Sequence, residues 1–128
     1  MTTRRWIVFI AVLGIAAVVG LRLAYLHPLW MSESALRSWI LEKEPFGSSE
    51  DHVRELFARH GWQANYEWRG ESSDDARSFP GVRGEHIIGA YLGHYQGLPF
   101  RVDIDAFWGF DGSGRLVDLR VRKMTDAP

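Results

Sequence analysis

Three aspartates near the C-terminus have the residue type and spacing that catalysis or metal binding requires. Asp103 and Asp105 alternate along a predicted strand, and Asp111 follows in a turn. Neighbouring carboxylates can bind Ca²⁺ or act as general acid and base. The spacing does not match a calcium-binding loop, and both strand aspartates are expected to face arginines of the next strand. We therefore expect surface ion pairs here.

Histidines are the second group that could do chemistry, because imidazole binds transition metals. The chain has five of them and no cysteine: His27, His52, His60, His86 and His94. Helical zinc motifs place two histidines four residues apart, whereas His52 and His60, on one predicted helix, are eight residues apart. His86 and His94 are expected at opposite ends of one strand. The sequence therefore predicts no metal site and no cofactor.

Motifs for nucleophilic catalysis and phosphate binding are also incomplete. Gly112-Ser113-Gly114 lies in a predicted hairpin tip rather than in a strand-to-helix turn. Gly81-Val82-Arg83-Gly84 lacks the strand, glycine loop and helix that hold a phosphate. We therefore expect that the protein is not an enzyme; an enzyme of another type, with a site assembled from distant residues, is the third and least favoured hypothesis.

Composition narrows the classes of partner. The formal net charge is −1 with both signs interspersed, which argues against a nucleic-acid-binding surface. The lack of cysteine excludes disulfides and a lipidated cysteine anchor. A protein or apolar partner is therefore favoured over nucleic acid.

The N-terminal segment is the most apolar part of the chain. Residues 6–26 are predicted to form a transmembrane helix that contacts the lipid bilayer, with Trp6 at one interface and Tyr25 and Trp30 at the other. A buried core helix and a cleaved signal peptide are the alternatives. Arg4 and Arg5 before the helix predict a bacterial inner-membrane protein with its domain on the periplasmic side.

Small residues recur every fourth position within this helix. Ala16, Gly20 and Ala24 therefore share one face, and such faces can bring two helices close together. We expect either a homodimer contact through them or no role beyond the usual abundance of small residues in apolar helices.

Two amphipathic helices are predicted next. The first has Ser32 or Ser34 as its N-cap, and the second begins at Ser48 or Ser49. Gly61 is expected to end the second helix in a left-handed conformation.

The remainder of the chain has the alternating pattern of strands, predicted over residues 63–68, 86–95, 100–110 and 115–123. The last hairpin is expected to pair Trp108 with Val117 and Ala106 with Leu119. The same register places Asp105 opposite Arg120, and it also places Asp103 opposite Arg122. Either Ile88, Ala90 and Leu92 or the residues alternating with them face the core, because Gly89 and Gly93 permit a bulge.

The predicted architecture is thus α+β: an N-terminal transmembrane helix followed by a two-layer domain, with two helices on one face of a four-stranded antiparallel meander sheet. Its divisions are a basic N-terminus (1–5), the transmembrane helix (6–26), a juxtamembrane linker (27–31), the α+β domain (32–124) and a tail (125–128).

The order of helices and strands, the Gly47–Asp51 helix entry and the Phe110–Gly112 hairpin resemble BamE/SmpA-like envelope domains. The resemblance covers about three-quarters of the chain in layout, although those lipoproteins are typically anchored through a cysteine. It implies an envelope interaction module and assigns no functional residues.

The expected function is a membrane-tethered interaction or accessory domain with a protein partner. Its candidate surface is the sheet face opposite the helices, where four apolar side chains would align: Ile87, Tyr91, Tyr95 and Phe107. The alternative for this face is that the N-terminal segment, the long polar loop predicted over residues 69–84, or lipid headgroups cover it. A small apolar-ligand or lipid-binding domain with a pocket between sheet and helices is the second hypothesis.

Overall fold

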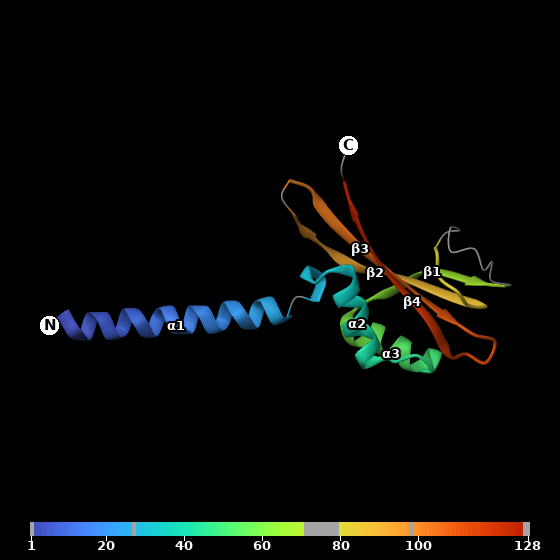
Figure 1. The fold of residues 1–128 in the computed structure, drawn as a ribbon, viewed down its shortest axis with the longest axis horizontal. Coiled ribbons are helices and arrows are strands. Elements are labelled where there is room, and N and C mark those ends of the chain that lie inside the picture. The colour runs from blue at the N-terminus through green and yellow to red at the C-terminus, as the bar shows by residue number, and fades with distance from the viewer. Residues whose placement is uncertain (1, 27, 71–79, 98, 127–128) are drawn as a thin grey trace.

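The computed structural model describes residues 2–26, 28–70, 80–97 and 99–126. Three α-helices and a short 3₁₀ helix precede four strands (Figure 1). Their bounds are α1 (Thr2–Leu26), η1 (Pro28–Trp30), α2 (Glu33–Lys43), α3 (Glu50–His60), β1 (Gln63–Arg69), β2 (His86–Gln96), β3 (Arg101–Phe110) and β4 (Leu116–Thr125). The α+β class and the four-stranded antiparallel sheet are confirmed.

Helix α1 extends away from the other elements as a separate arm (Figure 1). No helix in the part of the chain that the structure describes combines the length and apolarity needed to cross a membrane. The prediction of a transmembrane helix at residues 6–26 is therefore wrong. The single-pass anchor and the inner-membrane location with a periplasmic domain are wrong with it.

The physical reason lies in the charges that bound the apolar run. Arg5 and Arg22 enclose 16 uncharged residues, Trp6 to Leu21. At 1.5 Å per residue this run measures about 24 Å, whereas a hydrocarbon core is about 30 Å thick. The expected span reached sufficient length only by including Arg22 and the four residues after it.

Helices α2 and α3 begin and end where local chemistry requires. Ser32 caps α2 by accepting a 3.2 Å hydrogen bond from the Ala35 amide, and Ser49 caps α3 through the His52 amide at 3.3 Å. Gly61 ends α3 with φ of 68°, a left-handed conformation that costs glycine little. The structure thus confirms Ser32 and Ser49 among the expected N-caps, and Gly61 as the end of α3.

The main core lies between these two helices and one face of the sheet. Leu36, Ile40 and Leu56 contribute from the helices and are fully buried. Trp108 is also fully buried on the sheet, and the Phe57 ring packs edge-on against it with 4.6 Å between centroids. This burial of large apolar surface holds the helical layer against the sheet.

The strands follow one another in the order β1-β2-β3-β4. Two side chains of α2 reach the outer edge of β4. Arg37 Nε donates to the Leu119 carbonyl at 2.8 Å, and the Lys123 amide donates to Glu33 Oε1 at 2.8 Å. Helix α2 is therefore joined to β4 by hydrogen bonds as well as by apolar contacts.

The predicted register of β3 and β4 is wrong by two residues along most of the ladder. Trp108 pairs with Leu119, and Asp105 with Arg122. The intervening turn is longer than expected, because the Asp111 amide donates to the Arg115 carbonyl and strand pairing starts at Leu116. Val117 is then the extra residue of a bulge. A slip of two preserves the faces, so the core residues remain inside.

The predicted ion pairs form with different arginines. Arg122 Nη2 lies 3.2 Å from Asp105 Oδ2, and Arg101 Nη2 lies 3.0 Å from Asp103 Oδ1. Arg120 instead donates to the Pro80 carbonyl at 3.0 Å. The two strand aspartates are therefore engaged as acceptors, with partners set by the observed register.

Candidate functional site

Two of the four residues of the predicted partner surface are buried. Ile87 and Phe107 form a small second cluster with Val82 on the sheet face away from the helices. Tyr66 and Trp68 pack against the same cluster from β1. The segment before β2 thus covers this part of the face. This agrees with the alternative in which the long loop covers the apolar residues.

The two tyrosines of that surface lie on opposite faces of the sheet. Tyr91 pairs with Asp105, but the next paired residue, Gly93, lies opposite the core residue Ile104, so Leu92 is extra. This bulge turns Tyr95 toward the helices, where it packs against the main core. The predicted four-residue surface is therefore not continuous.

Tyr91 belongs to a polar group on the outer face. Its hydroxyl donates to Asp103 Oδ1 at 2.7 Å and accepts from Arg101 Nη2 at 3.2 Å. Burial and the hydrogen bond to Asp103 raise the pKa of Tyr91, and the bond from Tyr91 lowers the pKa of Asp103. These groups satisfy one another, so the cluster has the character of a surface ion-pair network.

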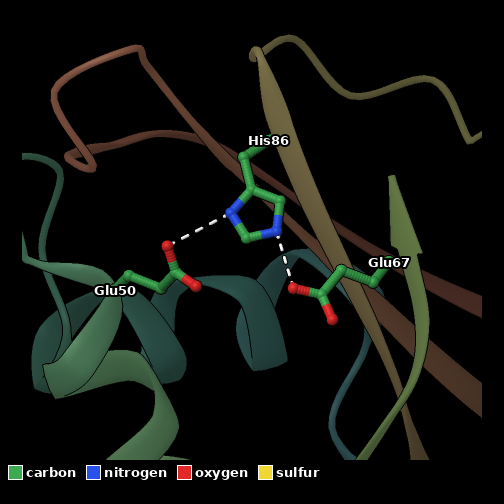
Figure 2. Close-up of side chains that lie close together, drawn as sticks. All are labelled: Glu50, Glu67 and His86. Carbon is green, nitrogen blue, oxygen red and sulfur yellow. Dashed lines mark hydrogen bonds and ion pairs between the residues drawn. The ribbon is translucent and has the colours of Figure 1, made fainter. Parts of the chain in front are cut away.

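A second polar cluster, formed by Glu50, Glu67 and His86, joins three elements at one corner of the domain. Figure 2 shows the His86 ring between the two carboxylates, with one ring nitrogen facing each. His86 Nδ1 lies 3.1 Å from Glu50 Oε2, and Nε2 lies 2.8 Å from Glu67 Oε1. The histidine side chain is only 7% exposed, compared with 24% for Glu50 and 45% for Glu67.

Local folding brings these three residues together. Glu50 is the first residue of α3, directly after the Ser49 cap. Glu67 pairs with the core residue Ile88, and His86 stands two residues before Ile88 in β2. Because side chains two apart share a face, both Glu67 and His86 project toward the helical layer. The first turn of α3 meets them there.

Two arginines complete the charge balance of the cluster. Arg54 Nη2 lies 2.9 Å from Glu50 Oε1 and 3.1 Å from Glu67 Oε1. Arg69 Nη2 lies farther away, at 3.9 Å from Glu50 and 3.7 Å from Glu67. Arg54 therefore bridges the two carboxylates: on Glu50 it contacts the oxygen that His86 leaves free, and on Glu67 it shares Oε1 with His86.

These contacts set the titration of the carboxyls. Burial by itself raises the pKa of Glu50, but hydrogen bonds from Arg54 and His86 outweigh it, and the pKa lies below its ordinary value. The hydrogen bond from His86 is the main cause that lowers the pKa of Glu67. Both carboxyls are therefore held in the ionised form.

The donor types also fit a divalent metal, because one ligand atom from each of Glu50, Glu67 and His86 lies within 4.8 Å of the others. A metal ion would bind one ring nitrogen while the other nitrogen donates to a carboxylate, as metal-bound histidines usually do, so the two ring contacts fit either occupant. Arg54 already supplies positive charge between the glutamates. The arrangement therefore suits a proton and a guanidinium better than a metal.

No pattern in the amino-acid sequence predicts this cluster. Glu50 falls within the predicted Gly47–Asp51 helix entry and His86 at one end of a predicted strand, and neither position indicates a contact between them. The β1–β2 register, in which Arg69 pairs with His86, is what brings Glu67 alongside the ring. A register argument for these two strands is the signal that could have found it.

No family model, curated protein or solved structure matches the chain. The resemblance to BamE/SmpA-like domains consequently stays a prediction.

Proposed function

We propose that the protein is an interaction module that docks on a partner protein through α1. The observation behind the proposal is the exposure of the apolar side chains of this helix. Ten large ones are between 51% and 65% exposed: Trp6, Ile7, Val8, Phe9, Ile10, Val12, Leu13, Ile15, Val18 and Val19. An exposed apolar surface of this kind is typical of an interaction site.

An isolated helix gains little stability in water, since most helical stability comes from packing of an apolar face. The exposed residues of α1 are nearly consecutive, so they occupy all sides of the helix rather than one stripe. A partner that buries them must therefore enclose the helix, as the groove or bundle of a larger protein does.

The charge of α1 indicates the chemistry of the partner's rim. Arg4 and Arg5 lie in the first turns, and the helix contains no acidic residue. A partner with acidic groups beside its apolar groove would complement this end. Two copies of α1 bring no opposite charges together, which makes the homodimer through Ala16, Gly20 and Ala24 a weaker candidate. The side chains at residues 20–28 lie outside the described part of the structure.

The second hypothesis, a pocket for a small apolar ligand between sheet and helices, gains no support. That space is occupied by main-core side chains, with Leu36, Ile40 and Trp108 fully buried. The interaction proposal is therefore the one that the geometry favours.

The test is a binding measurement with a partner captured by crosslinking and then purified. Phe9→Asn combined with Leu13→Asn places two polar groups one turn apart on α1. Each large apolar side chain contributes about 1.5–3 kcal/mol on burial, so the Kd should rise at least about tenfold. Val117→Asn is the matched control, because Val117 is 43% exposed on β4, away from α1.

The proposal fails if the double variant binds the partner as tightly as the control does. It also fails if the full chain forms only homodimers, or if it attaches to protein-free phospholipid vesicles and has no protein partner.

A further inference from the structure

We propose that His86 carries two ring protons at neutral pH and, as an imidazolium, locks the first turn of α3 onto the corner formed by β1 and β2. The lock is a pH-sensitive conformational device built into the fold. It does not depend on the function proposed for α1.

The hydrogen-bond geometry carries the inference. A neutral imidazole has one N–H donor and one acceptor nitrogen, whereas an ionised carboxylate only accepts. Both nitrogens of His86 face carboxylate oxygens, at 3.1 Å and 2.8 Å. A neutral ring would leave a lone pair directed at one carboxylate. Only the imidazolium donates to both.

Charged side chains from two elements surround the ring. Helix α3 contributes Glu50 and Arg54, and β1 contributes Glu67 and Arg69. Strand β3 contributes only the uncharged Phe110 ring, with 6.0 Å between centroids. The two arginine side chains are 41% and 70% exposed, so solvent screens them more than it screens the 7%-exposed histidine. The buried ring is therefore the cation best placed to pair with both glutamates.

A metal ion is the rival occupant of this corner. It would have to displace the proton between Nε2 and Glu67 as well as the Arg54 guanidinium that bridges the carboxylates. The proton requires neither rearrangement, so the geometry points to the proton.

Loss of the second ring proton should reach beyond the cluster. The Glu50 amide donates to the Gly114 carbonyl at 3.2 Å, and Ser49 forms an isolated bridge with Arg115. The start of α3 is thus connected to the turn between β3 and β4. When alkaline pH breaks the contacts of His86, we expect both the α3 N-terminus and this turn to loosen.

The direct test is a long-range ¹H–¹⁵N NMR measurement of the histidine rings in the full chain at pH 7. We expect both nitrogens of His86 to show protonated shifts, with no change on addition of ZnCl₂ or EDTA. A neutral tautomer, or a Zn²⁺-dependent shift of Nε2, would overturn the proposal.

The second test measures urea unfolding from pH 6 to pH 9 for the full chain and for His86→Gln. The folding constant of the full chain should fall relative to the variant by up to about tenfold per pH unit while the ring loses its proton. His94→Gln is the control, because His94 is exposed on the same strand. A constant difference between full chain and variant would contradict the lock. If His86→Gln does not fold, the ring shifts of the unaltered chain decide.

Discussion

The ionisation of Glu50 links one side chain to the stability of the domain. Its pKa is lowered in the folded chain, so its contribution is present above the ordinary carboxyl range. That contribution is lost as the pH falls through the lowered pKa, because the protonated carboxyl no longer accepts from Arg54 and His86. Acid should therefore weaken the hold of α3 on the sheet.

A charge-neutral substitution tests this link. Glu50→Gln should lower the free energy of unfolding by about 1–2 kcal/mol at pH 7, because hydrogen bonds to a charged acceptor are lost. The difference from the unaltered chain should shrink toward zero below about pH 4. Urea unfolding at several pH values measures it, with Glu55→Gln, exposed on the same helix, as the control. A difference that persists at low pH would count against the assignment.

For single residues, the neighbouring sequence was sufficient to predict the helix caps but not the contacts between distant side chains. Ser49 and Gly61 could be placed because a cap depends on a few neighbouring residues. Glu67 and His86 are 19 residues apart and meet only through strand pairing, so no local pattern could reveal their contact.

The elements of the sheet are fixed by close backbone packing as well as by side chains. The segment before β2 crosses β3 at Gly109. A Cβ added there would collide with the Arg83 carbonyl oxygen and approach Val82 Cγ1 to 2.8 Å. The absence of a side chain at this position is what allows Val82 to reach Ile87 and Phe107.

Gly109→Ala should therefore push this segment off the sheet and destabilise the protein by about 1–3 kcal/mol, the usual cost of overpacking. Chemical denaturation measures the loss. Gly14→Ala in α1 is the control, since nothing lies within 4 Å of its added Cβ. Equal stability of the two variants would show that the segment has room to move.

Strand positions were predicted well from alternation, but their registers were not. The slip of β4 comes from the Asp111–Arg115 turn together with the bulge at Val117, and the reversal at Tyr95 comes from the bulge at Leu92. One inserted residue moves every later side chain of the strand to the opposite face of the sheet. The four residues of the predicted surface therefore do not share one face.

The whole molecule consists of a helical arm and a two-layer head (Figure 1). The main core draws its residues from α2, α3 and the sheet, with Leu29 and Met31 packed at its margin. None of the α1 side chains that the structure describes, residues 3–19, belongs to it. The apolar composition of residues 6–26 predicts a helix there. Whether such a helix crosses a membrane depends on the length of its uncharged run and on the charges at its ends, which composition alone does not measure.

Removal of residues 1–26 should leave the head folded, with a Tm within a few degrees of that of the full chain, because the described side chains of α1, residues 3–19, make no core contact. Circular dichroism and thermal unfolding of the shortened chain measure this. An unfolded or non-cooperative product would mean that the arm supports the core.

The hydrogen bonds that join Arg37 and Glu33 to the backbone of β4 have a further consequence for the behaviour of the protein at high concentration. They occupy outward-pointing peptide groups that a strand from another molecule would need for edge-to-edge sheet growth. This side of the sheet is thereby protected against the intermolecular stacking that leads to fibrils.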